Sequence, residues 1–492
     1  MIRTGEQYRE SIRDGREVWM NGEKIKDVPT HPAFKPLVDI RARIYDMAHD
    51  PATSATMTYT DEESGELNAV QQKPPRTRQD WEDKRAATDA VLTDVGGVVT
   101  RVGDETIGEV WSLIDGQDVL NQINPAYAEN VKRHIDLACF GDPFHVSANT
   151  DPKGDRSKRP QDQDPDMLLH AVRETDRGIV VRGAKYETAA AYSNQAFAKP
   201  TIANWGDSEL SDYALGFMLD MGAPGLKYIC RTGFAGSAKP VEDYPVSNRF
   251  DEVDTLVVFD DVEIPWENIL FYRDTKAATF IRATLHRYSA YAFTQRNLRL
   301  ADLMIGAALW NVKQTGLEKQ QAVQEKLATL ACYREGINAH LTAAIAMAEP
   351  SPGGLLMPNQ SLLYTGRVLA CSQLHEMMHI ARELCGGQIC ITPDKASFDD
   401  PETGPWLEKF YSVNEHWVAE DRRKLLAYAR DLLNSDYAGH RLTFQLFAQS
   451  PPFAHLGAVY RNFGWDGPLD LVKDAAGLSD NVLATLGRKA AK

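Results

Sequence analysis

The most explicit chemical pattern in the chain is a pair of histidines four residues apart. His375 and His379 enclose Glu376 in the order His-Glu-Met-Met-His, within a stretch that is predicted to be helical. Side chains at i and i+4 share one face of a helix, so the two imidazoles could bind Zn²⁺ while Glu376 acted as a general base. A hydrolase of this kind needs a third ligand, and the short pattern also arises by chance on structural helices. A metal-dependent hydrolase is therefore one alternative.

Other common catalytic signatures are absent from the sequence. No Gly-x-Gly-x-x-Gly follows a predicted strand, so a Rossmann nicotinamide site is not indicated. Neither a phosphate-binding P-loop nor a Gly-x-Ser-x-Gly nucleophile elbow is present. Cys385 and Cys390 have no second cysteine pair beside them, and lone cysteines behave mostly as small buried hydrophobic residues. We therefore predict no metal site.

The composition is that of an acidic globular protein. The 492 residues carry a formal net charge of −15 at pH 7, with 43% hydrophobic and 25% charged residues. An acidic chain does not favour binding to phosphate backbones, so we expect no nucleic-acid partner. Six scattered cysteines predict no disulfide framework. Because neither a signal peptide nor a run of about 18 apolar residues is present, we expect a cytoplasmic protein without a membrane span.

The elements that must position any site fall into three regions, which predict an α+β fold. Residues 1–150 read mainly as helices. Thr77 to Asp80 have the spacing of a capping box, and the helix that follows should bury Trp81, Ala87 and Val91. A second helix is predicted over 127–140.

Residues 151–275 read as a β domain and residues 276–492 as a helical bundle with a tail. Short β-branched runs predict strands at 178–183 and 254–259. Four stretches are each long enough for a bundle helix: 276–311, 317–348, 360–385 and 404–434.

Two segments carry a resemblance to a known family. They are Asp151-Pro152-Lys153-Gly154-Asp155-Arg156-Ser157-Lys158 and Val258-Phe259-Asp260-Asp261-Val262-Glu263-Ile264-Pro265-Trp266-Glu267. Further matches follow in the same order along the chain, at 3–8, 14–23, 30–34, 178–185 and 286–289. Together they resemble the large oxygenase component of the 4-hydroxyphenylacetate 3-hydroxylase family.

The resemblance implies an acyl-CoA-dehydrogenase-like fold: an N-terminal helical domain, a central β domain and a C-terminal four-helix bundle, in a homotetramer. It also implies a two-component flavin monooxygenase. Reduced FAD comes from a separate NAD(P)H:flavin reductase and reacts with O₂ to a C4a-hydroperoxyflavin, which hydroxylates a small aromatic or heteroaromatic ring. The flavin carries the difficult chemistry, and the protein excludes water and positions the substrate.

Three stretches are similar to the family's flavin contacts. The first is the loop that enters the β domain, with Ser147, Asn149, Lys153, Asp155 and Arg156, where amides and the guanidinium could hold the pyrophosphate. The second contains Thr188 and Ala189, expected near the isoalloxazine, and the third contains His440 and Arg441. The alternatives are a surface ion pair for Arg156 and a histidine packed at the end of the bundle for His440.

The chain departs from the family where its phenol hydroxylases carry an arginine, a tyrosine and a histidine. The arginine corresponds to Arg101, the tyrosine to Glu105, and the histidine to Ser147, with His145 two residues earlier. Glu105 could accept from a ring N–H or neutralise a cationic nitrogen, and it would repel a phenolate. The substrate would then be a nitrogen heteroaromatic or amine-bearing ring, whose hydroxylation could lead to ring opening. The alternative is a solvent-facing Arg101–Glu105 helix pair worth about 0.3–0.5 kcal/mol.

Two other branches of this fold fit less well. A dehydratase branch holds an iron–sulphur cluster, but its cysteine positions fall on Arg101, Glu105 and Phe293, and only the histidine position, His286, is kept. An acyl-CoA-type flavin dehydrogenase needs a carboxylate base. Glu408 and Glu415 are available for it on a predicted C-terminal helix, without a convincing match.

Overall fold

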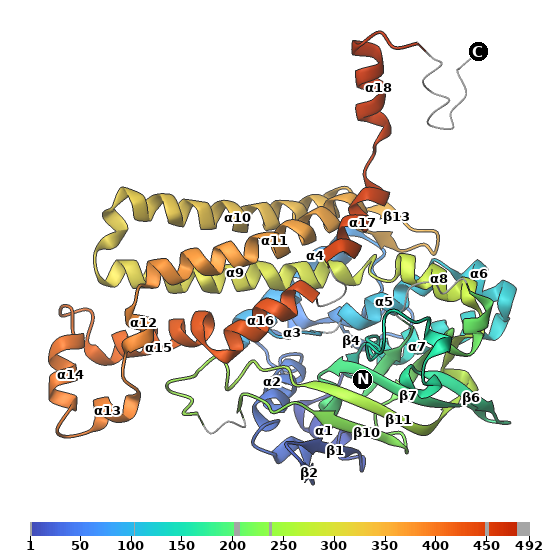
Figure 1. Cartoon of the computed structure of the whole chain (residues 1–492), viewed down its shortest axis with the longest axis horizontal. Helices are drawn as coiled ribbons and strands as arrows, with labels where there is room; N and C mark the ends of the chain where they lie inside the picture. Colours follow the sequence, from blue (N-terminus) through green and yellow to red (C-terminus); the bar gives the residue numbers. More distant parts are fainter. Residues whose placement is uncertain (1, 103, 201–206, 236–238, 448–451, 480–492) are drawn as a thin grey trace.

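The computed structural model describes residues 2–102, 104–200, 207–235, 239–447 and 452–479. Figure 1 shows long helices lying over a region that contains most of the strands, with helix α18, Asp466–Ala475, projecting away from both. No helix within the described ranges is long and apolar enough to cross a membrane.

The N-terminal part is mainly helical. Its helices are α1 Gly5–Ser11, α2 Lys35–Asp46, α3 Ser54–Met57, α4 Arg78–Val95, α5 Asp104–Ile114, α6 Gln117–Ile123 and α7 Pro125–Gly141. The predicted capping box is confirmed, because the Thr77 hydroxyl accepts from the Asp80 amide while the Asp80 carboxylate accepts from the Thr77 amide. Trp81, Ala87 and Val91 are buried as expected. Helix α7 covers the predicted 127–140.

Two sheets form the centre of the molecule. Their strands are β1 Glu17–Met20, β2 Glu23–Ile25, β5 His145–Val146, β6 His170–Glu174, β7 Gly178–Thr188, β8 Gln195–Ala198, β9 Leu215–Asp220, β10 Leu226–Cys230, β11 Asp254–Pro265 and β12 Ile269–Tyr272. One sheet has the order β2-β1-β10-β11-β7-β6 and the other β12-β9-β8-β5. Strand β1 pairs in parallel with β10, so the first sheet also takes strands from outside 151–275. Two small hairpins, β3 Thr58–Thr60 with β4 Leu67–Ala69 and β13 Glu349–Pro350 with β14 Leu356–Met357, lie apart.

Both predicted strands are the first parts of longer ones. The expected 178–183 continues as β7 to Thr188, and 254–259 continues as β11 to Pro265. The two pair antiparallel along their length, with a register shift between Phe259 and Val262. This ladder carries Thr188 to a position opposite Asp254.

The C-terminal part is helical. Its helices are α8 Thr275–Thr284, α9 Ser289–Gln314, α10 Gln321–Ala346, α11 Gln360–Cys385, α12 Gln388–Ile391, α13 Lys395–Asp399, α14 Gly404–Tyr411, α15 Ala419–Asn434, α16 Asp436–Phe447, α17 Pro452–Asn462 and α18 Asp466–Ala475. Helices α9, α10 and α11 pack against one another as the long layer of Figure 1, and α15 packs on α9 and α11. The segregation of helices and sheets confirms the predicted α+β class.

Two of the predicted bundle helices were wrong as continuous elements. The stretch 276–311 breaks between α8 and α9, and the break contains His286. The stretch 404–434 breaks between α14 and α15, because the Asn414 side chain accepts from the amides of His416 (2.9 Å) and Trp417 (3.1 Å) and closes a turn.

The His-Glu-Met-Met-His pattern lies on the exposed face of α11. His375, Glu376 and His379 are all exposed, and the Tyr333 hydroxyl donates to Glu376 at 2.6 Å. Among the described residues no group of three potential metal ligands gathers around them. The structure therefore lends no support to the hydrolase alternative.

Candidate active site

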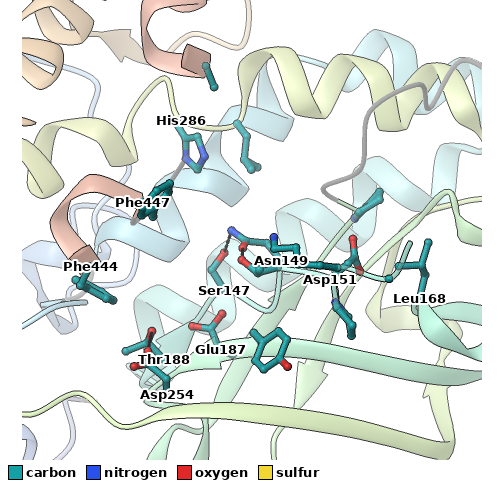
Figure 2. A pocket seen from close by; sticks show the side chains of 18 of the residues that line it. Ser147, Asn149, Asp151, Leu168, Glu187, Thr188, Asp254, His286, Phe444 and Phe447 are labelled. Atoms are coloured by element: carbon teal, nitrogen blue, oxygen red, sulfur yellow. Dashed lines mark hydrogen bonds between the residues drawn. The ribbon is translucent and has the colours of Figure 1, made fainter. Parts of the chain in front are cut away.

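A cavity of about 1470 Å³ lies where the central sheets meet the helices. Its walls come from α5, the loop after β5, the end of β7, the α8–α9 break and helices α9, α16 and α17. Figure 2 shows His286 entering from the α8–α9 break, and Phe444 and Phe447 from α16. Eight predicted site residues line this cavity: Arg101, Glu105, Ser147, Asn149, Lys153, Arg156, Thr188 and His440.

The loop after β5 forms a cationic mouth. Lys153, Arg156, Lys158 and Arg159 line it and are exposed. Gly154 has φ +52°, and a Cβ there would lie 2.5 Å from a side-chain oxygen of the same loop, so the tight path requires glycine. A set of exposed cations on one loop suits a phosphate-bearing ligand.

Two buried residues anchor that loop. Lys185 of β7 forms an ion pair with Asp151 and donates to the Lys199 carbonyl at 2.9 Å.

Asp155, a predicted flavin contact, does not line the cavity. Its carboxylate accepts from the amide (3.0 Å) and the hydroxyl (2.7 Å) of Ser157 and so stabilises the turn.

The closed end of the cavity contains a buried cluster around Glu109 of α5. Ser147 donates to Glu109 Oε2 at 2.6 Å, and Lys199 Nζ donates to Ser147 Oγ at 2.5 Å and pairs directly with Glu109. His286 Nδ1 lies 3.5 Å from Glu109 Oε1. Burial lowers the pKa of Lys199, and the attraction of Glu109 opposes that shift.

Arg101 and Glu105 lie in this closed end with separate partners. Arg101 donates to the carboxyl group of Glu187 on β7, whereas Glu105 lies 2.8 Å from Arg296 Nε of α9. Glu105 is only 7% exposed. The alternative of a solvent-facing Arg101–Glu105 pair was therefore wrong. Burial raises the pKa of Glu187 to about 8, although Arg101 opposes the shift.

His145 lies on β5 beside the large cavity without lining it. It lines a separate void of about 30 Å³ together with Arg101 and Tyr45. Burial lowers the pKa of His145 to about 3, so its imidazole is neutral at pH 7.

Of the remaining residues predicted to contact the flavin, one lines the cavity and two are buried in the core. His440 lines the cavity, lies 2.8 Å from Asp254, and packs against Phe444. Arg441, the next residue, is buried outside the cavity and donates to the Phe250 carbonyl at 3.0 Å. Ala189 is also buried and does not line the cavity; its φ of +66° turns the chain out of β7.

Several residues of the closed end were not predicted from the sequence: Glu109, Glu187, Lys199 and Arg296. One signal was available, because Glu105 and Glu109 are i and i+4 on a helix that is otherwise largely apolar. Lys199 and Glu187 gave no comparable signal, since each ends or interrupts an apolar strand and finds its partner far along the chain.

The carboxylates proposed for an acyl-CoA-type dehydrogenase lie elsewhere. Glu408 is on α14 and Glu415 is in the turn before α15; both are exposed and neither lines the cavity. The geometry does not favour that alternative.

Comparison with known proteins covers nearly the whole chain. Residues 4–271 match the family model described as 4-hydroxyphenylacetate 3-hydroxylase N terminal, and residues 275–477 match its C-terminal counterpart. The 4-hydroxyphenylacetate 3-monooxygenase oxygenase component of Thermus thermophilus is 28% identical, over 94% of each chain. The 4-nitrophenol 2-monooxygenase oxygenase component of a Rhodococcus species is 30% identical, over 90% of this chain and 85% of that one.

Comparison with solved structures gives the same result. A 4-hydroxyphenylacetate 3-monooxygenase oxygenase component, crystallised with FAD and 4-hydroxyphenylacetate, superposes with a TM-score of 0.88 at 27% identity, over 97% of this chain and 99% of that one. An archaeal 4-hydroxybutyryl-CoA dehydratase from N. maritimus has a TM-score of 0.88 at 22% identity, over 97% of this chain and 96% of that one, which shows a shared fold.

The resemblance inferred from the sequence is thus confirmed, together with the flavin monooxygenase activity and FAD as cofactor. The chain belongs to the 4-hydroxyphenylacetate 3-hydroxylase family and is the oxygenase component of a flavin-dependent monooxygenase.

Proposed function

We propose that this chain uses reduced FAD and O₂ to hydroxylate a small nitrogen-bearing aromatic ring at the closed end of the 1470 Å³ cavity. The reduced flavin would come from a separate NAD(P)H:flavin reductase. Opening of the ring would depend on the chemistry of the hydroxylated product, so the oxygenation step is the one assigned to this protein.

The residues around the cavity fit the flavin. The cations Lys153 and Arg156 at the mouth suit its pyrophosphate, while Thr188, Phe444 and Phe447 offer one hydroxyl and two aromatic faces to its rings. Bound reduced FAD supplies the activation of O₂ and the transfer of one oxygen atom. The protein's part is to bind both rings, to orient them and to keep water out.

The observation that carries the substrate class is the set of carboxyl groups at the closed end, where Glu105, Glu109 and Glu187 each lie beside a buried cation. A phenolate brought to this end would meet carboxylate oxygens at close range in a poorly solvated space, which is unfavourable. A ring N–H or an amino group can donate to a carboxylate, and a ring acceptor beside it can receive a hydrogen bond from Arg101.

Single-turnover oxygenation with a panel of rings tests this function. Full-length protein would be mixed anaerobically with chemically reduced FAD, then with O₂ and a phenol, a pyridine or a pyrrole. We expect oxygenated product from a nitrogen-bearing ring, with little hydrogen peroxide. Peroxide in place of product with every ring would refute the monooxygenase proposal, and a preference for simple phenols would refute the substrate class.

The Glu105→Gln variant tests the pocket role directly. It keeps the shape of the side chain but removes the charge, so kcat/KM for the nitrogen-bearing ring should fall about ten- to hundredfold, the usual value of a hydrogen bond to a charged group. Glu129→Gln is the matched control, because Glu129 is exposed on α7. Equal kcat/KM in the two variants would exclude Glu105 from substrate binding.

We further propose a cytoplasmic homotetramer. Helix α18 projects from the body in Figure 1, whereas α17 packs against α11, and both carry exposed apolar side chains, among them Leu456, Tyr460, Leu471 and Val472. Exposed apolar side chains on two successive helices suit a protein interface. Continuity with the cavity supports a second copy of the chain as the occupant, since Phe453 of α17 lines it. Light scattering should give four times the 54.8 kDa chain mass, and a monomer mass would contradict the proposal.

A further inference from the structure

The turn formed by Thr100 and Arg101, called the strained turn below, is held by side chains from distant parts of the chain. Arg101 has φ +54°, in the left-handed region that residues with a Cβ rarely adopt. Thr100 is buried, and side chains bind both polar groups of its backbone. Its amide donates to the Glu252 carboxylate, and its carbonyl accepts from Arg41 Nη2 at 3.0 Å. The direction in which Arg101 leaves the backbone is thus set by residues that do not line the 1470 Å³ cavity.

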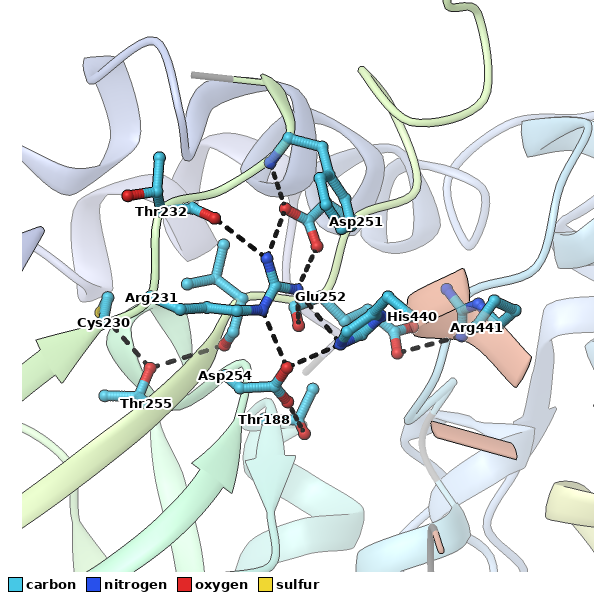
Figure 3. Close-up of polar contacts among 12 residues, drawn as sticks. Thr188, Cys230, Arg231, Thr232, Asp251, Glu252, Asp254, Thr255, His440 and Arg441 are labelled. Atoms are coloured by element: carbon cyan, nitrogen blue, oxygen red, sulfur yellow. Dashed lines mark hydrogen bonds and ion pairs between the residues drawn. The ribbon is translucent and has the colours of Figure 1, made fainter. Parts of the chain in front are cut away.

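Glu252 also binds helix α16, through the carboxylate oxygen that does not accept from the strained turn. Arg441 Nη1 lies 3.4 Å from Glu252 Oε2 (Figure 3), and Arg441 Nη2 donates to the Phe250 carbonyl at 3.0 Å. Both charged side chains are buried, with 2% of Arg441 and 6% of Glu252 exposed. One buried carboxylate therefore joins the strained turn to a helix that forms a wall of the cavity.

The segment that carries Glu252 is itself fixed by ion pairs. Arg231 donates to Asp251 at 2.5 Å and to Asp254 at 2.9 Å, on either side of Glu252, and to the Glu252 carbonyl at 3.2 Å. His440 of α16 lies 2.8 Å from the same oxygen of Asp254. Figure 3 shows these side chains gathered around the guanidinium of Arg231. Glu252 thus reaches the strained turn from a segment that has little freedom to move.

We propose that Glu252 and Arg441 are positioning residues, which act through the strained turn to hold the Arg101 side chain in the orientation that binds the substrate. This inference rests on the proposed function, in which Arg101 donates a hydrogen bond to the bound ring. The far end of the same side chain is held by Glu187. A guanidinium that is already oriented loses less conformational freedom on binding, so the ring binds more tightly.

The backbone strain explains why Arg101 needs such an anchor. In the left-handed conformation the Cβ of Arg101 lies close to the next carbonyl oxygen, so a free chain would relax to negative φ. A strained residue of this kind persists only where its surroundings fix it. Loss of the Glu252 contact should therefore let the turn relax and move the Arg101 side chain.

The test is the dissociation constant of the ring, measured on full-length Glu252→Gln protein loaded with FAD. The probe is the member of the phenol, pyridine and pyrrole panel that gives most product with wild type. A glutamine amide has one acceptor oxygen, so either Thr100 or Arg441 loses its partner. The ring should bind about tenfold more weakly, the value of one hydrogen bond, while the dissociation constant of FAD keeps its wild-type value.

A double-mutant cycle shows whether Glu252 acts through Arg101. Arg101→Met removes the guanidinium and should itself weaken binding of the ring. In that background Glu252→Gln should cause no further loss, because no guanidinium remains to be positioned. Glu129→Gln, exposed on α7, is the control for a glutamate-to-glutamine change. Arg441→Met should cause the same loss as Glu252→Gln and takes its place in the cycle if that variant does not fold.

Hydrogen exchange gives a readout that needs no substrate. The Thr100 amide is buried and donates to Glu252, so it should exchange slowly in wild type. In Glu252→Gln it should exchange about tenfold faster, since the strained turn has lost its acceptor.

The outcomes separate the two proposals. Weaker binding of the ring in the wild-type background, with no further loss beside Arg101→Met, supports the inference. Equal losses in both backgrounds, or an unchanged dissociation constant in Glu252→Gln, overturn it while the proposed function stands. If wild-type protein oxygenates no ring of the panel, the proposed function has failed and the inference falls with it. Thermal unfolding of each variant confirms that it is folded.

Discussion

Replacing Lys199 with methionine should lower the free energy of unfolding by roughly 3–5 kcal/mol, the usual cost of removing one partner from a buried ion pair. Lys199 has a fully buried side chain, and its ammonium contacts both Glu109 and Ser147. Methionine fills a similar volume but leaves the Glu109 carboxylate buried without its cation. Urea unfolding of wild type and variant measures the difference.

The control for this prediction is Lys227→Met. Lys227 pairs with Asp260 at 2.6 Å, but both side chains are largely exposed, at 40% and 59%. An exposed pair contributes little because both ions stay hydrated, so this variant should unfold nearly as wild type does. Adding Glu109→Gln to Lys199→Met should recover part of the loss, because the uncompensated charge is removed. Equal stability of Lys199→Met and Lys227→Met would show that the Glu109 cluster is not the buried ion pair described above.

The sequence alone predicts those helices whose apolar periodicity and capping residues lie within the helix itself. Helix α4 is an example, since its capping box and its buried Trp81 follow from residues within the helix. Strand β7 shows that the local sequence pattern predicts only part of a strand. The apolar run stops near Gly183, yet the strand continues to Thr188 because β11 supplies the hydrogen-bonding partner. Tertiary pairing here overrides the weak local preference of a polar segment.

The candidate site shows the same contrast between residues that local sequence predicts and residues that only the fold brings together. Residues on the loop after β5 could be located by resemblance, because they belong to one continuous segment. The pairs Lys199–Glu109 and Arg101–Glu187 join residues 90 and 86 positions apart, so only the folded chain brings them together. Conversely, the His375–His379 pattern is local and correct in spacing, but its helix face is exposed and lacks a third ligand within the described residues.

The stability of the protein should fall as the pH rises from about 6.5 to 8, and Glu187 should be the cause. Burial raises the pKa of Glu187 from 4.5 to about 8. Within this interval the folded state keeps the Glu187 proton and the unfolded state has lost it. The unfolded state therefore binds fewer protons, and the free energy of unfolding decreases with pH by up to about 1.4 kcal/mol per unit.

Two histidines titrate with the opposite sign at lower pH. Burial lowers the pKa of His134 to about 4 and that of His145 to about 3, both from 6.5. Below 6.5 the unfolded state binds the extra protons, so these histidines make stability rise with pH and offset Glu187. Glu187→Gln removes only the carboxyl titration. The difference between wild-type and variant unfolding curves, measured in urea from pH 5 to 9, therefore isolates Glu187.

We expect the Glu187→Gln curve to be flatter than that of wild type above pH 6.5, with the gap widening up to about pH 8 and constant beyond it. Parallel curves would mean that Arg101 keeps Glu187 ionised throughout, because a group charged in both states cannot make stability depend on pH in this range. The distinction bears on the cavity as well. A protonated Glu187 can donate a hydrogen bond to a bound ring, whereas an ionised one can only accept. The pH at which the two curves stop diverging thus marks the pH at which the closed end of the cavity changes from donor to acceptor at this position.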